Sequence, residues 1–206
     1  MRGSLLIRLI LLLLLSACNS EISSVSPANG IPNIGDGGFL SGEPCGAPCL
    51  WDIIPGITNE AQVKHILQAK GVFQACDTVN NEAESGSRGI VCPLMGVNFQ
   101  RGSDIVDGVG FSPSQKFTLG QVIEKYGAPN AVLLMVSGRP EEQPRTAMRL
   151  YYDDIKTALV LPEQEGVEFN VDPSVQIQSV NYSSEQSYES FGLPLLKWKG
   201  FGKYEP

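Results

Sequence analysis

FTLGQVIEKYGAP, residues 117–129, is the stretch from which the fold class of this chain is inferred. Thr118 and Gln121 have the spacing of a capping box, in which the two side chains satisfy free backbone groups at a helix start. Gly127 and Pro129 are typical of a helix end. The stretch therefore predicts a helix over 119–126, with one apolar face made by Leu119, Val122, Ile123 and Tyr126.

A second helix is predicted over Thr58–Lys70. Thr58 is expected to cap it, and Glu60 would lie in the first turn, where a negative charge is favourable. Gly71 would end it. Its apolar positions are Val63, Ile66 and Leu67.

Strand-like runs follow each helix. The runs after the earlier helix are Val72–Thr78, Gly89–Phe99 and Ile105–Phe111, and those after the later one are Ala131–Val136, Ala147–Tyr152, Thr157–Leu161 and Val175–Tyr182. Because no further long helix alternates with these runs, we expect antiparallel sheets.

The order of one helix and then several strands occurs twice, which predicts an α+β fold of two tandem helix-plus-antiparallel-sheet (αβββ) units packed as one body. The first unit would cover residues 45–115 and the second 116–190. A chance likeness between two amphipathic helices is the alternative to a true repeat.

The N-terminus has the parts of a secretory signal. Arg2 and Arg8 precede an apolar run that ends in Leu15-Ser16-Ala17-Cys18. This ending resembles the bacterial lipobox, which implies cleavage after residue 17 and a diacylated Cys18 that anchors the protein in a membrane. A membrane-spanning helix is disfavoured because the apolar run is short of about 20 residues. An ordinary signal with a chance cysteine is the other alternative.

Composition after residue 17 is that of a globular protein with an acidic surface. Of the 15 basic residues two lie in the signal, which leaves 13 against 22 acidic residues and a net charge of −9. An acidic surface repels phosphate backbones, so no nucleic-acid partner is expected. Residues 18–44 are rich in Ser, Gly, Pro and Asn, and we expect a flexible tether there.

Four cysteines remain beyond Cys18, and an even number in an exported chain indicates two disulfides. Three pairings are possible. Cys76 and Cys92 flank a Gly- and Ser-rich stretch typical of a hairpin loop, so we expect them to pair. Cys45 would then pair with Cys49. Metal binding or redox chemistry is the rival use of such a C-x3-C segment, and it is disfavoured because the chain has one histidine.

Residues for catalysis are scarce. The single histidine, His65, falls on the predicted helix, where a solvated position is expected rather than a catalytic base. Asp153 and Asp154 fit a polar turn between two strands. Asp104 and Asp107 lack the companions of a calcium loop. The sequence predicts no catalytic site, no metal and no cofactor.

The C-terminal segment, residues 191–206, combines aromatic and basic residues in an acidic protein. Its simplest interpretation is a strand or tail that covers the sheet. The alternative is a docking segment for a partner or for anionic lipid headgroups, with Trp198, Phe201 and Tyr204 as contact residues.

Two further resemblances concern the helix openings. IPGITNEAQV, residues 54–63, resembles the opening of BamE/SmpA-like lipoproteins and of the β-lactamase-inhibitor-protein fold, and residues 117–120 and 126–129 look like a second opening and exit. In the tandem inhibitor fold each unit has a disulfide, which Cys76–Cys92 matches in the first unit and nothing matches in the second. PCGAPCLW, residues 44–51, is similar to a segment of exported lipoproteins of unknown function.

These families imply a non-enzymatic protein-binding module of the cell envelope, held outside the cytoplasm. It would be anchored to the outer face of the plasma membrane, or to an outer membrane, and would bind another envelope protein. The alternative is a ligand-binding or hydrolytic lipoprotein whose site is assembled from scattered residues.

Overall fold

The computed structural model describes residues 31–81, 87–139, 141, 143–189 and 195–206. The predicted signal, Cys18 and residues 18–30 of the expected tether lie outside these ranges. Among the described residues, no helix is both long and apolar enough to cross a membrane.

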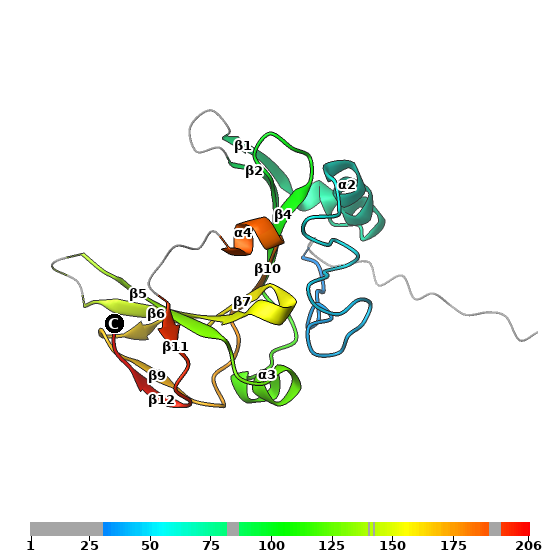
Figure 1. Cartoon of the computed structure of the whole chain (residues 1–206). Coiled ribbons are helices and arrows are strands. Elements are labelled where there is room, and N and C mark those ends of the chain that lie inside the picture. The colour runs from blue at the N-terminus through cyan, green and yellow to red at the C-terminus, as the bar shows by residue number, and fades with distance from the viewer. Residues whose placement is uncertain (1–30, 82–86, 140, 142, 190–194) are drawn as a thin grey trace, which may run out of the picture.

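One antiparallel sheet organises the chain (Figure 1). Its strands lie in the order β1-β2-β3-β4-β10-β7-β6-β5-β11, and β8 adds to β6. A separate two-stranded sheet pairs β12 with β9. The strand bounds are β1 Asp77–Asn81, β2 Ser87–Cys92, β3 Met95–Phe99, β4 Val106–Phe111, β5 Ala131–Ser137, β6 Arg145–Tyr152, β7 Thr157–Val160, β8 Gln164–Glu165, β9 Phe169–Val171, β10 Ser179–Ser183, β11 Leu196–Lys197 and β12 Gly202–Tyr204.

The prediction of two αβββ units is wrong. Strand β10 pairs with β4 on one side and with β7 on the other, so the strands that were assigned to separate units form one continuous ten-stranded sheet. The described part of the chain has more strand than helix and contains three α-helices. Sharing β10 removes two exposed sheet edges that separate units would have left.

The helix predicted over 119–126 is confirmed as α3, Leu119–Tyr126, with the capping box of Thr118 and Gln121. The earlier helix is α2, Glu60–Ala69, and its cap differs from the prediction. Asn59 caps it and forms a capping box with Gln62, whereas the Thr58 hydroxyl accepts a hydrogen bond from the Ile54 backbone N–H at 2.8 Å. A third helix, α4, spans Glu185–Glu189.

Residues 34–44 are folded onto the domain, so the expected tether extends too far. We call this segment the N-terminal collar. Phe39 is fully buried, with ring centroids 4.9 Å from Tyr126 and 5.7 Å from Phe117. Asp36 holds the loop by accepting hydrogen bonds from Gly38, Leu40 and Ser41.

Hydrogen bonds fix the collar to α3 as well. The Tyr126 hydroxyl donates to the Phe39 carbonyl, and Lys125 Nζ donates to the carbonyls of Phe39 and Leu40. Burial alone would raise the pKa of Asp36, but its hydrogen bonds from the collar backbone and Ser41 outweigh this effect and hold that pKa below its usual value.

Both predicted disulfides are present. Cys76–Cys92 links the start of β1 to the end of β2 at the base of their hairpin, and Cys45–Cys49 closes a short loop between the collar and α2. The run predicted as one strand over 89–99 is instead the β2–β3 hairpin, because Pro93 and Leu94 form a turn in which Leu94 has a φ of 66°.

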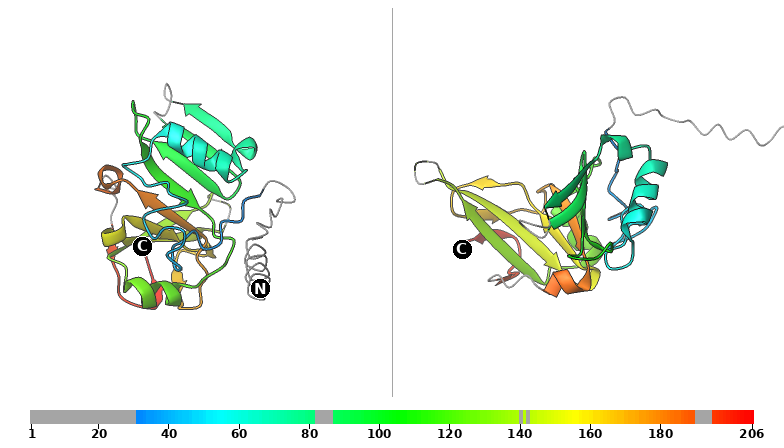
Figure 2. Two further views of the ribbon diagram at one scale, coloured as in Figure 1. Left: turned by 90° about the vertical axis from the view of Figure 1, so that its right-hand side faces the viewer. Right: turned by 90° about the horizontal axis from the view of Figure 1, so that it is seen from above.

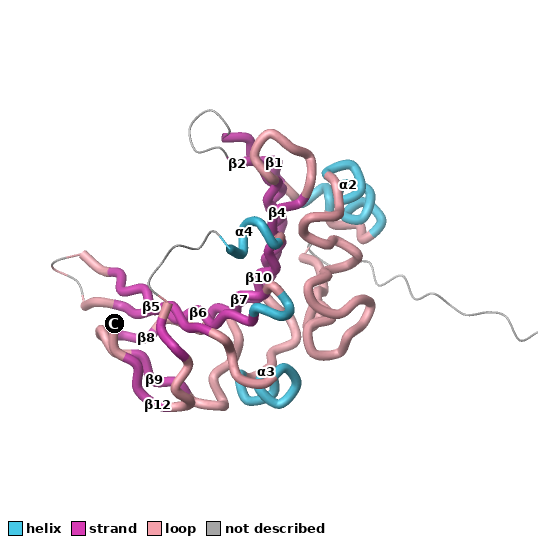
Figure 3. Tube along the Cα trace, in the orientation of Figure 1, coloured by secondary structure: helices cyan, strands magenta, loops and turns pink. Residues whose placement is uncertain are grey.

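The sheet is strongly bent, and its two faces differ (Figures 1 and 2). On the outside of the bend lie α2, α3 and the loops of residues 31–59, which Figure 3 shows as a continuous irregular layer. The main hydrophobic core fills this side, with Val97, Val180 and Leu150 among its buried strand residues. The inside of the bend, which we call the inner face, carries α4 at its rim.

Candidate functional site

The inner face is crossed by one row of residues in register. Each member is paired with the next across adjacent strands, and side chains alternate between faces along a strand, so all of them lie on the inner face. The row consists of Asp77, Val91, Gly96, Gly110, Asn181, Ala158, Tyr151, Ala131 and Lys197.

Small residues occupy the middle of this row and the rows beside it. Gly96 and Gly110 are paired on β3 and β4, and Gly89 and Gly108 flank Asn98 in the neighbouring row. The floor of the inner face over β2–β4 is therefore largely backbone. Missing side chains also allow a sheet to bend toward that face.

The four glycines are not equivalent. A Cβ at Gly89 would lie 2.5 Å from the Val97 carbonyl oxygen, and one at Gly108 would lie 3.2 Å from the Tyr182 carbonyl oxygen. At Gly96 a Cβ would meet no atom within 4 Å. The fold requires glycine at position 89, whereas it leaves open space at position 96.

A cavity of about 310 Å³ lies on this floor. Its polar groups come from Asn98, Asn181, Ser112 and Ser179, and its apolar lining is contributed by residues of the β3 and β4 strands and by Leu94. Leu94 is 39% exposed, and Val91 in the adjacent strand is 51% exposed. Exposed apolar side chains beside a small-residue floor form a surface suited to a protruding side chain of another molecule.

The other half of the inner face, over β5–β7, is filled by larger side chains. Leu133, Tyr151 and Ala158 form a second buried cluster there, separate from the main core. Burial raises the pKa of Tyr151, and the neighbouring Arg149 guanidinium offsets this only in part. Arg149 shares the inner face with Tyr151, two residues along β6.

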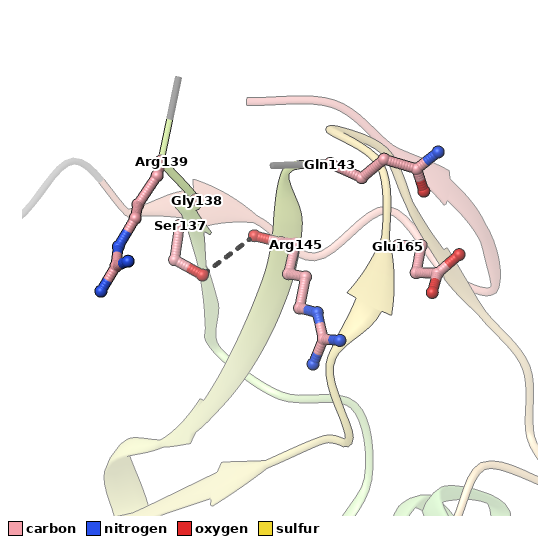
Figure 4. A pocket seen from close by; sticks show the side chains of 6 residues that line it. All are labelled: Ser137, Gly138, Arg139, Gln143, Arg145 and Glu165. Carbon is pink, nitrogen blue, oxygen red and sulfur yellow. Dashed lines mark hydrogen bonds between the residues drawn. The ribbon is translucent and has the colours of Figure 1, made fainter. Parts of the chain in front are cut away.

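A larger cavity of about 620 Å³ lies at the tip of the β5–β6 hairpin (Figure 4). Figure 4 shows Arg139 and Arg145 extending to the same side of the hairpin, with Glu165 on the adjoining strand β8. Arg145 lies 3.9 Å from Glu163. Residues 140 and 142 at this tip are outside the described ranges.

The candidate groups near α2 do not form a metal centre. Cys45, Cys49 and Asp52 place ligand atoms within 4.8 Å of one another, but both sulfurs are used in the disulfide and offer no thiolate. His65 is exposed on α2, as expected, and lines a cavity of about 540 Å³ together with Asp52.

The remaining acidic candidates have roles in turns and in hydrogen bonds that hold the fold together. Asp153 begins a short 3-10 helix between β6 and β7, which agrees with the predicted turn. Asp107 accepts a hydrogen bond from the Ser184 hydroxyl at 2.8 Å, and the Asp104 carbonyl accepts one from the Glu60 backbone N–H.

The three aromatic residues proposed for partner binding form one cluster near the C-terminus. Tyr204 is 1% exposed, and its hydroxyl donates to the Gly200 carbonyl and accepts from the Lys199 N–H. Trp198 stacks on Tyr204 with centroids 5.8 Å apart. Phe201 is 47% exposed, so it is the most exposed of the three. Residues 191–194 of this segment lie outside the described ranges.

Sequence reasoning missed the inner face. Its glycines were visible in the sequence, but their alignment depends on the register of strands that are far apart in the chain. No protein-family model, characterised protein or solved structure matches this chain.

Proposed function

We propose that this chain is a lipid-anchored protein of the bacterial cell envelope that binds another envelope protein through its inner face. The proposed anchor is Cys18. Binding without catalysis is also what the resemblance of its helix openings to BamE-like lipoproteins implies.

Gly96 is the observation that carries the proposal. Glycine inside a strand destabilises a protein by about 0.5–1 kcal/mol relative to alanine. A Cβ at this position would meet no atom within 4 Å, so alanine would fit the fold and is expected to stabilise it. A glycine that the fold does not require, on the open part of the inner face, is explained by a partner that approaches the backbone there.

The size of the inner face favours a protein over a small molecule. Its registered row crosses nine strands, but Ala158 and Tyr151 within it are buried, so the open part runs from Asp77 to Asn181, about 19 Å along the sheet at about 4.8 Å per strand. The cavity on its floor, of about 310 Å³, is at the small end for a ligand pocket.

The envelope location is supported by the covalent structure. Two disulfides are typical of a chain that folds in an oxidising compartment. Only residues 19–33 would separate Cys18 from the folded domain, so the domain would stay within about 50 Å of the lipid, at about 3.5 Å per residue.

Photo-crosslinking in the producing cells tests the proposal. A photoreactive residue at Asn98, exposed on the inner face, is expected to give a single protein adduct, whereas one at His65, exposed on α2, should give none. Equal labelling from both positions would contradict a specific inner-face interface. A small-molecule function would leave Asn98 without a protein adduct.

A further inference from the structure

Arg149 is a charged residue whose surroundings the binding role explains and the fold does not. It lies on the inner face of β6, paired with Leu133 on one side and Val160 on the other. Its side chain is partly buried, and its Nε is fully buried without a hydrogen-bond acceptor.

Ion pairs among the described residues do not include Arg149. Arg88 contacts Glu60 at 3.3 Å, and Arg145 contacts Glu163 at 3.9 Å. Arg149 has the Tyr151 hydroxyl beside it, and a tyrosine hydroxyl carries no charge at neutral pH. An arginine in such a site remains a cation, and a partly desolvated cation without an anion is unfavourable.

Arg149 lies near the glycine floor, the part of the inner face where Gly89, Gly96, Gly108 and Gly110 lie. Val160 pairs with Arg149 and also with Ser179, which lines the cavity over Gly96 and Gly110. Two strand spacings separate Arg149 from Ser179, about 10 Å between backbones. A protein that rests on the glycine floor would therefore bring its own side chains within reach of the Arg149 guanidinium.

We propose that Arg149 receives a single carboxylate, from an acidic side chain of the bound protein. This inference rests on the proposed function and names the chemistry of the partner. A guanidinium pairs with a carboxylate through two parallel hydrogen bonds, and the carboxylate would take them from the two Nη groups, since Nε itself is fully buried and out of a partner's reach.

The charge of the whole protein argues for one carboxylate and against a polyanion. The chain has a net charge of −7, and this field repels densely charged anionic surfaces such as membranes or nucleic acids. The neighbours Leu133, Tyr151 and Val160 are uncharged and apolar in the main, so an isolated acidic side chain among apolar contacts is the matching counterpart.

The first test needs no partner. Arg149→Met removes the charge and keeps most of the volume, and it should leave Tm unchanged or raise it, because the fold loses an uncompensated cation. Arg145→Met is the matched control, since Arg145 lies on the same strand and face with a side chain that is 62% exposed. A fall in Tm of more than about 5 °C for Arg149→Met alone would show a structural role and overturn the inference.

The second test probes anion binding directly. The whole chain, labelled with 15N-arginine and kept in non-ionic detergent, is titrated with sodium acetate and with inorganic phosphate against sodium chloride of equal ionic strength. The Nε–Hε signal of Arg149 is expected to shift saturably with acetate, and that of Arg145 is not. Absence of saturation, or a preference for phosphate of tenfold or more, would overturn the carboxylate assignment.

The third test separates this inference from the proposed function. In Arg149→Met the adduct formed from Asn98 should fall at least tenfold, and in Arg145→Met it should be unchanged. If the adduct persisted in Arg149→Met, the proposed carboxylate contact would be contradicted, whereas the proposed inner-face interface would still stand. If the parent chain itself gave no protein adduct from position 98, the proposed function would be contradicted.

Discussion

Phe39→Ala is expected to destabilise the domain strongly, because the collar is part of the core. Phe39 is fully buried, and its ring contacts those of Phe117, Tyr126 and Tyr182 with centroids between 4.9 and 6.4 Å apart. Removing a buried phenylalanine costs about 3–5 kcal/mol. For a domain of this size that loss lowers Tm by roughly 6–20 °C.

The assay is thermal and urea unfolding of the chain without its first 17 residues. Ile31→Ala is the matched control, since Ile31 precedes the collar and is 55% exposed, and its effect should stay within about 0.5 kcal/mol. If Phe39→Ala had the same Tm as the parent protein, the segment would be the flexible tether that composition alone predicted. The conclusion that the collar packs into the core would then be wrong.

Three further outcomes are expected. Replacing Cys76 and Cys92 by serine should cost about 3 kcal/mol, since the bridge spans 16 residues, and a urea midpoint equal to that of the parent would contradict this. Cys18→Ser should abolish lipid labelling and release the protein from membranes, and continued membrane partition of the correctly cleaved variant would refute the anchor. Tyr204→Ala should destabilise the domain by about 3 kcal/mol, whereas Phe201→Ala should leave Tm within 2 °C, so equal melting losses would show that both rings are structural.

Local signals in the sequence predicted the local structure well. The capping box at α3 works through contacts three residues apart, so it is independent of the rest of the fold. The same signal was present at α2, where Asn59 and Gln62 have this spacing. Thr58 was assigned the cap instead, but its hydroxyl is used by the turn that precedes the helix.

Longer-range structure could not be predicted because it depends on which strands meet. The repeated order of helix and strands was compatible with two sheets, and only the pairing of β10 with both β4 and β7 makes one sheet. Strands β8 and β11 have two residues each and β9 and β12 have three, which is too short for an alternating pattern.

The collar shows how composition can mislead. Gly, Ser and Pro predict a flexible segment on average, but here Asp36 ties the loop and Phe39 inserts into the core. One aromatic residue is enough to bury a segment when a matching site exists, and that site is built by residues 117, 126 and 182, far away in the chain.

The most direct test of the account is the adduct from Asn98 in the Gly96→Val variant, measured together with Tm. A Cβ at position 96 meets no atom within 4 Å and valine favours strand structure, so Tm should be equal to or above that of the parent. Its side chain would occupy the floor, so the adduct should fall at least tenfold. Gly89→Ala is the control for a glycine that the fold needs, and it should lower Tm. A Gly96→Val protein that is stable and still forms the parent adduct would contradict binding through the inner face.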